Sequence, residues 1–142
     1  MPNAYAYFRV FGEDLPLEEI TRQIGIEPTE SWRKGDPWKY FKAVPTSSWC
    51  LHSPLPRTLT DLQAHVEAVL ELLVPRRGAV RALSERFATS VVCVGTYDST
   101  TSPGLYLSRD VVALMASMGL ALDADLYFGE ESAPSTRGEA AL

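Results

Sequence analysis

Alternation of apolar and polar residues with a period of two predicts a strand at each end of this chain. In residues 4–11 one face carries the apolar set Ala6, Phe8 and Val10. The opposite face of that segment carries Tyr5, Tyr7, Arg9 and Phe11. In residues 120–128 one face carries the apolar set Leu120, Leu122, Ala124, Leu126 and Phe128. The opposite face of that segment carries Ala121, Asp123, Asp125 and Tyr127. Such alternation is typical of a strand that buries one face and presents the other.

Four further segments rich in aromatic and β-branched residues are predicted as strands, at 38–43, 47–52, 87–97 and 105–107. The centre of 87–97 is apolar on both faces, which indicates a central strand. The segment 26–36 contains Pro28 and turn residues, so we expect a loop there.

Apolar stripes with a helical period predict four helices, between Asp14 and Gly25, at 60–74, at 77–86 and from Ser108 to Gly119. Thr60 and Gln63 fit a capping box at the start of the longest helix. Ser108 fits the N-cap of the last helix, and Gly25 fits the residue that ends the first.

The predicted order of elements is therefore β-α-β-β-α-α-β-β-α-β. Short links between strands favour antiparallel neighbours. We expect an α+β fold with a mostly antiparallel sheet of about six strands and helices packed on one face. Residues 1–128 are expected to form a single domain. The small and polar residues of 129–142 are expected to form a disordered tail.

Three stretches of the sequence form a recognisable set: Gly-Ile-Glu-Pro-Thr-Glu at 25–30, Lys-Gly-Asp at 34–36 and Leu-Asp-Ala-Asp-Leu-Tyr-Phe at 122–128. With these stretches the chain resembles the bacterial family called domain of unknown function 4279. The resemblance spans roughly residues 5–128 and implies a bacterial origin. It implies no activity, cofactor or catalytic residue.

Composition excludes some partners. The chain has 142 residues, 46% of them hydrophobic, and a formal net charge of −5. Nucleic-acid binding is not expected, because phosphate contacts need clustered Lys and Arg. No segment approaches a membrane span, and the first residues do not resemble a signal peptide, so we expect a cytoplasmic protein.

Sequence motifs for common chemistries are absent. There is no phosphate-binding loop and no nucleophile elbow. Cys50 and His52 share a strand face, but a metal site needs three or four ligands, and only His65 remains among the histidines. We therefore predict no metal, no cofactor and no catalytic residue.

The outward faces of the strands form the first candidate site. Asp123 and Asp125 lie roughly 7 Å apart along one strand face, a spacing that suits paired carboxylates or a divalent cation. The alternative is a solvated outer face. The same side of the predicted sheet carries Tyr5, Tyr7, Arg9, Trp38, Tyr40 and Tyr127. If the first and last strands are neighbours, Arg9 lies near the two aspartates within an aromatic surface.

The second candidate is the loop around Trp32, Arg33 and Lys34. A Trp beside two cations could bind an acidic partner, or Trp32 could be buried while the cations stay solvated. An open aromatic face is too apolar for a comfortable monomer. We therefore expect the Glu27–Asp36 loop to cover part of it, with Trp32 as a plug, and a homodimer to cover the rest.

Two functions follow from these residues. The first is a non-catalytic binding module that binds a protein partner, as an immunity-type protein binds a toxin, or a second copy of itself. The alternative is a small-molecule binder or hydrolase that uses the aromatic and acidic sheet face. The alternative requires a pocket of roughly 300 Å³ or more at that face.

Overall fold

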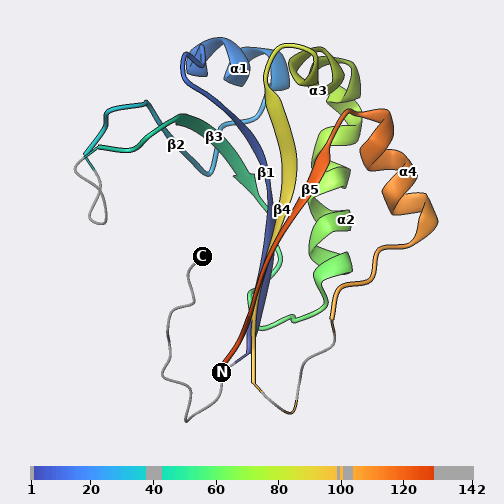
Figure 1. Cartoon of the computed structure of the whole chain (residues 1–142). Coiled ribbons are helices and arrows are strands. Elements are labelled where there is room, and N and C mark those ends of the chain that lie inside the picture. The colour runs from blue at the N-terminus through green and yellow to red at the C-terminus, as the bar shows by residue number, and fades with distance from the viewer. Residues whose placement is uncertain (1, 38–42, 99, 101–103, 130–142) are drawn as a thin grey trace.

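The computed structural model describes residues 2–37, 43–98, 100 and 104–129 and shows an α+β fold with a five-stranded sheet (Figure 1). The strands are β1 (Asn3–Gly12), β2 (Glu30–Trp32), β3 (Ser47–His52), β4 (Ala88–Tyr97) and β5 (Ala121–Phe128). The helices are α1 (Leu17–Ile24), α2 (Leu62–Leu73), the 3₁₀ turn η1 (Val74–Arg76), α3 (Arg77–Ser84) and α4 (Arg109–Ser117). The predicted fold class is confirmed.

The sheet is mixed rather than wholly antiparallel, with the strand order β2-β3-β1-β4-β5. The pairs β2/β3, β3/β1 and β1/β4 are antiparallel, and the pair β4/β5 is parallel. The parallel pair arises because α4 carries the chain from one end of β4 back to the other before β5 begins (Figure 1). Strands β2 and β5 are the two edges.

Two segments depart from the sequence-based prediction. Residues 30–32, predicted within a loop, form β2 by pairing with β3, with Ser31 opposite Trp49. Residues 105–107, predicted as a strand, join no sheet, because Leu105 and Leu107 instead pack from an irregular segment against the core. The predicted strand at 38–43 lies almost entirely outside the described residues.

Helix ends show which local signals were read correctly. Ser108 caps α4, since its Oγ accepts a hydrogen bond from Val111 N at 3.3 Å. Gly25 follows α1 in the left-handed region with φ of 78°. The predicted capping box is wrong, because α2 is capped by Asp61, which accepts from Gln63 N at 3.0 Å. The Gln63 side chain instead accepts a hydrogen bond from Ser108 N.

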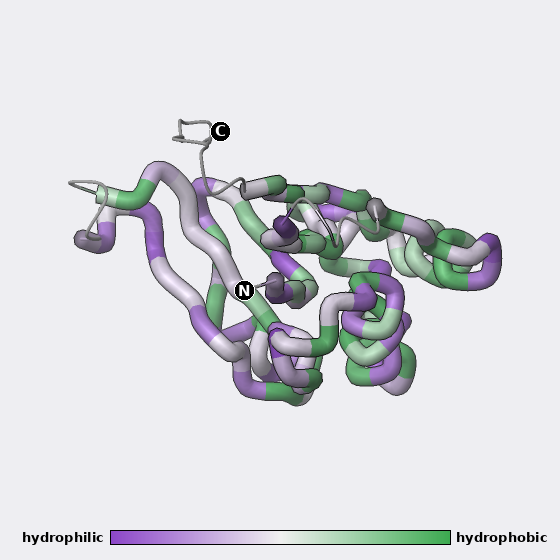
Figure 2. Tube along the Cα trace, turned by 90° about the horizontal axis from the view of Figure 1, so that it is seen from below, coloured by the Kyte–Doolittle hydropathy of each residue, from purple (hydrophilic) through white to green (hydrophobic). Residues whose placement is uncertain are grey.

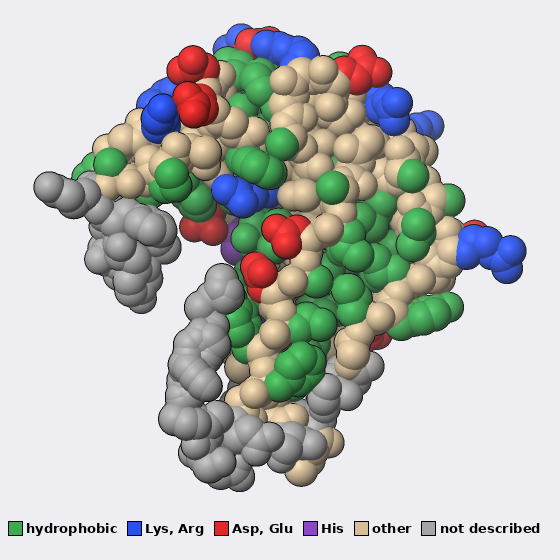
Figure 3. Space-filling model, in the orientation of Figure 1, with side chains coloured by type: hydrophobic (Ala, Val, Ile, Leu, Met, Phe, Trp, Pro, Cys, Tyr) green, Lys and Arg blue, Asp and Glu red, His purple; other side chains and the backbone are tan. Residues whose placement is uncertain are grey.

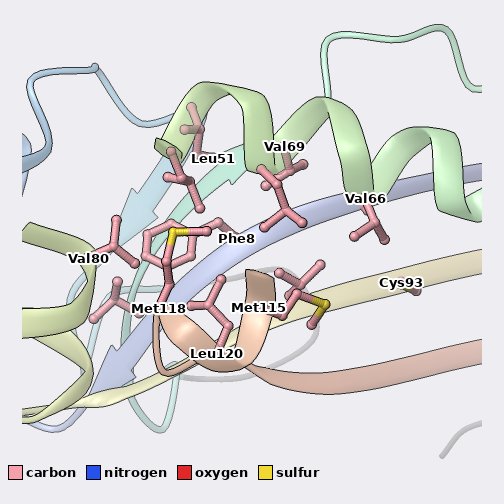
Figure 4. Packing of buried hydrophobic residues seen from close by; sticks show 14 of the residues in the cluster. Phe8, Leu51, Val66, Val69, Val80, Cys93, Met115, Met118 and Leu120 are labelled. Atoms are coloured by element: carbon pink, nitrogen blue, oxygen red, sulfur yellow. The ribbon is translucent and has the colours of Figure 1, made fainter. Parts of the chain in front are cut away.

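The hydrophobic core lies between the sheet and the helices, which all cover one face (Figures 1 and 2). Helix α2 packs along β1 and β4. Burial alternates along β1 as predicted, with Ala4, Ala6, Phe8 and Val10 fully buried. Figure 4 shows Phe8 among Val69 of α2, Val80 of α3 and Met118, which directly follows α4. The other face of β1 therefore points away from every described helix.

Candidate functional site

The helix-free face is the side of the sheet opposite the core. From β1 it carries the predicted residues Tyr5, Tyr7 and Arg9. The register brings β3 side chains beside them, because Tyr7 pairs with His52 and Arg9 pairs with Cys50. Strand β2 adds Glu30 to the same face, because Glu30 pairs with Cys50, which in turn pairs with Arg9. The face thus gathers aromatic and polar side chains from segments far apart in sequence.

Asp123 and Asp125 belong to the helix-free face but do not neighbour β1. Asp123 pairs with Val92 of β4, and Val92 pairs with Tyr7 of β1. One strand therefore separates the aspartates from Arg9, and adjacent strands are roughly 4.8 Å apart. The condition that the first and last strands are neighbours is therefore not met, because the long apolar β4 lies between them.

A hollow of about 470 Å³ opens on the helix-free face between β1 and the chain that returns from β2 to β3. Its lining consists of Tyr5, Tyr7, Arg9, Trp32, Asp36, Pro37, Val44, Pro45 and Thr46. A recess on this side of the sheet is visible in the space-filling view (Figure 3). The hollow is larger than the volume that a small-molecule site needs.

Arg9 supplies the positive charge in the hollow. Its Nε and Nη2 donate to Ser48 Oγ at 3.2 and 3.1 Å, and its guanidinium lies 4.2 Å from the Phe11 ring centroid. No carboxylate of the described chain forms an ion pair with Arg9. A cation held by a hydroxyl and a ring keeps its charge available to an anion.

Three stacked aromatic rings lie on the helix-free face beside Arg9. Tyr7 and His52 lie 4.7 Å apart between centroids and 11° from parallel, and Tyr5 lies 5.6 Å from His52. His52 Nε2 contacts Glu30 Oε2 at 3.0 Å, and the Arg57 guanidinium lies 3.7 Å from the Tyr5 ring centroid. Burial is the main reason that the pKa of Tyr7 lies well above its ordinary value. The stack is therefore a preorganised aromatic wall.

Cys50 lies on this face but is buried. Burial, reinforced by the negative charge of Glu30, raises the pKa of its thiol to about 12. At neutral pH the thiol is therefore protonated and a poor nucleophile. Within the described part of the chain, no three His, Cys, Asp or Glu side chains are grouped to hold a metal ion.

Asp123 and Asp125 are exposed on β5 and do not line the hollow. Partial burial, and then the charge of Asp123, raises the pKa of Asp125, while Arg9 acts in the opposite direction. Neither aspartate forms an ion pair with a described residue. The pair is thus an acidic patch at the edge of the sheet.

The second candidate, Trp32, Arg33 and Lys34, lies at and next to the edge strand β2. Trp32 is half-buried on edge strand β2 and forms a wall of the hollow, so the expected plug over the face is wrong. Arg33 pairs with Glu18 at 2.6 Å, and Lys34 pairs with Glu13 at 3.1 Å. These cations are therefore engaged within the chain. Residues 30–32 of the predicted cover extend the sheet as strand β2 instead of crossing its face.

Of the remaining predicted residues, Tyr127 does not line the hollow. Tyr127 is 42% exposed near the end of β5. Trp38 and Tyr40 lie outside the described residues. Sequence reasoning missed Val44, Pro45 and Thr46, which line the hollow only because the β2–β3 connection folds beside β1. The Gly35-Asp36-Pro37 turn was a visible signal for a reversal of the chain, although not for a cavity.

Comparisons with known proteins add one finding. The family described as Domain of unknown function (DUF4279) matches residues 2–129. No curated protein and no solved structure matches the chain. Among the described residues, no helix combines the length and the apolar character needed to span a bilayer.

Proposed function

The chain belongs to the family Domain of unknown function (DUF4279), and because that description names no activity, we propose from the site itself that it is a non-catalytic binding module. The ligand enters the hollow on the helix-free face. The observation that carries this proposal is an aromatic hollow of about 470 Å³ with an Arg side chain that no described carboxylate neutralises.

The shape and lining of the hollow support binding of an apolar, planar group. Tyr5, Tyr7 and Trp32 present ring surfaces, and Val44 and Pro45 complete the apolar wall. Binding sites for small ligands are mostly apolar with a few polar groups that fix orientation. Aromatic side chains also lose little conformational entropy on binding.

Arg9 indicates an anionic group on the ligand. Its contacts with Ser48 and Phe11 orient the guanidinium without satisfying its charge. Among the described lining residues the one carboxylate is that of Asp36, which accepts a hydrogen bond from Arg33 N at 2.9 Å. A carboxylate on an aromatic body would meet both the rings and the cation. A partner protein that inserts such a group would use the same contacts.

The lining argues for binding rather than for hydrolysis. The two aspartates considered as paired carboxylates lie outside the hollow, one strand beyond β4. The Cys50 thiol is held protonated by burial. A hydrolase would need a nucleophile or an acid and base that converge on one point.

The test is an NMR titration with indole-3-acetate and with its uncharged amide. We expect indole-3-acetate to shift amide signals of Tyr7, Trp32 and Thr46, and the amide to bind about tenfold more weakly, since charge-assisted hydrogen bonds contribute about 1.5–3 kcal/mol. Arg9→Met should remove that preference. The control Arg109→Met changes an exposed Arg on α4, far along the chain from the hollow, and should leave binding unchanged.

Two results would contradict the proposal. One is a titration in which neither compound shifts the signals of the hollow while the protein is folded. The other is equal affinity for the acid and the amide, which would show that Arg9 does not recognise an anion.

A further inference from the structure

Strand β5 is an edge strand of eight residues that is exposed along nearly its whole length. Gly129 N donates to Tyr97 O of β4 at 2.8 Å. Because backbone groups alternate in direction along a strand, the N–H groups of 122, 124, 126 and 128 point to the free edge. Among the described strands only β4 pairs with β5, so these groups can bond to a further strand.

The two faces of β5 differ in chemistry. Toward the helices, Leu122 is 46% exposed and Phe128 is 51% exposed. On the helix-free face, Asp123 and Asp125 carry two negative charges without an ion pair to any described residue. In Figure 3 hydrophobic side chains gather between β5 and α4, and acidic side chains lie on the other side of the strand.

A second copy of the chain fits this edge poorly. Antiparallel pairing of β5 with itself around a twofold axis at Ala124, which aligns most of the two strands, places Asp123 of one copy opposite Asp125 of the other. Like charges directly opposite each other on neighbouring strands are destabilising. The chain's own residues 130–142 fit poorly as well, because they contain three Glu, one Arg and a Pro.

We propose that β5 binds an extended segment of a partner protein as a sixth strand, and that this segment is basic at alternate positions. Its Lys or Arg side chains face Asp123 and Asp125, and its apolar side chains pack beside Leu122 and Leu126. Backbone hydrogen bonds supply affinity in this mode of recognition, and the side-chain pattern supplies specificity. The surface is separate from the hollow, so this inference does not rest on the proposed ligand.

The experiment uses the full chain and synthetic peptides of about nine residues, long enough to cover the strand. The first peptide alternates Lys and Val. The second replaces each Lys by Glu, and the third has the composition of the first with its Lys and Val residues in two blocks. Binding is followed by NMR at the amides of β5 and by fluorescence anisotropy of labelled peptides.

We expect the alternating Lys peptide to bind at β5, and the Glu and block peptides to bind at least about tenfold more weakly. Asp123→Asn together with Asp125→Asn should weaken the Lys peptide at least about fivefold and reduce its salt dependence. The matched control Glu67→Gln with Glu71→Gln removes two exposed charges from α2 and should change little.

Ala124→Pro tests the backbone contact. It removes an N–H that points to the free edge and leaves the hydrogen bonds to β4 in place. Binding should be lost while circular dichroism shows a folded protein. If this variant is unfolded, N-methylation of alternate peptide residues provides the same test from the partner's side.

Several outcomes would overturn the inference. Equal binding of the alternating and block peptides would show unspecific attraction to an acidic protein. A wild-type dimer in sedimentation that Ala124→Pro dissociates would assign the edge to a second copy. Peptide binding that occurs only after removal of residues 130–142 would assign it to the chain's own end.

Discussion

The phenol ring of Tyr97 folds back over Gly95, two residues earlier on the same face of β4. A Cβ atom on Gly95 would lie 2.5 Å from Tyr97 Cε2 and 2.7 Å from its hydroxyl oxygen. Tyr97 is only 2% exposed, its hydroxyl donates to Thr60 O at 3.4 Å, and its ring stacks on Phe128 with centroids 5.9 Å apart. The missing side chain at Gly95 therefore lets Tyr97 join the start of α2 to the end of β5.

Gly95→Ala should lower the free energy of unfolding by about 1–3 kcal/mol, since the added methyl group forces a buried ring to move. Urea denaturation measures the change. Gly78→Ala is the matched control, because an added Cβ there meets no atom within 4 Å and Gly78 lies in α3. The control should be neutral or stabilising by up to about 1 kcal/mol. Equal effects of the two changes would refute the packing argument.

His65 joins α2 to the segment that precedes it. The side chain is fully buried, its Nε2 donates to Leu59 O at 2.7 Å, and its Nδ1 accepts from Ser53 Oγ at 2.9 Å. His65→Leu removes both hydrogen bonds and should cost about 1–2 kcal/mol, since each such bond contributes about 1 kcal/mol. Ser53→Ala removes one of these bonds and should cost about half as much. A His65→Leu variant as stable as the wild type would show that water replaces the imidazole.

The two cysteines should be unreactive in the native protein. Burial raises the pKa of both Cys50 and Cys93 to about 12, so almost no thiolate is present at pH 8. Ellman's reagent should label neither until denaturant is added. The pKa of the thiols is about 9 in the unfolded chain and about 12 in the folded protein, so unfolding releases protons above pH 9. The thiols' contribution to the free energy of unfolding therefore falls as the pH rises from about 9 toward 12. Fast labelling of one thiol at pH 8 would locate a local opening of the sheet.

The pKa of Asp125 reports on the acidic edge. Partial burial and the Asp123 carboxylate raise it, and Arg9 lowers it. Asp123→Asn should therefore move the pKa of Asp125 down, and Arg9→Met should move it up. Carbon-13 NMR titration of the Asp125 carboxyl group measures both. If neither substitution changes the pKa, the two strands do not place these charges on one face.

Local periodicity was sufficient for much of this molecule. The alternation in residues 4–11 correctly separated the buried side chains of β1 from Tyr5, Tyr7 and Arg9. The apolar stripes located all four α-helices, and the double-sided apolar centre of 87–97 identified a strand that does lie inside the sheet. These features follow from the sequence because each depends on residues close along the chain.

Tertiary structure alone decided how the segments meet. Glu30–Trp32 has little strand character of its own and becomes β2 only because β3 offers an edge with which to pair. The place of β4 between β1 and β5 separates Arg9 from the aspartates, and the return of the chain past Val44 encloses the hollow. Such pairings join residues distant in sequence through backbone groups that every residue carries, so no local pattern of side chains specifies them.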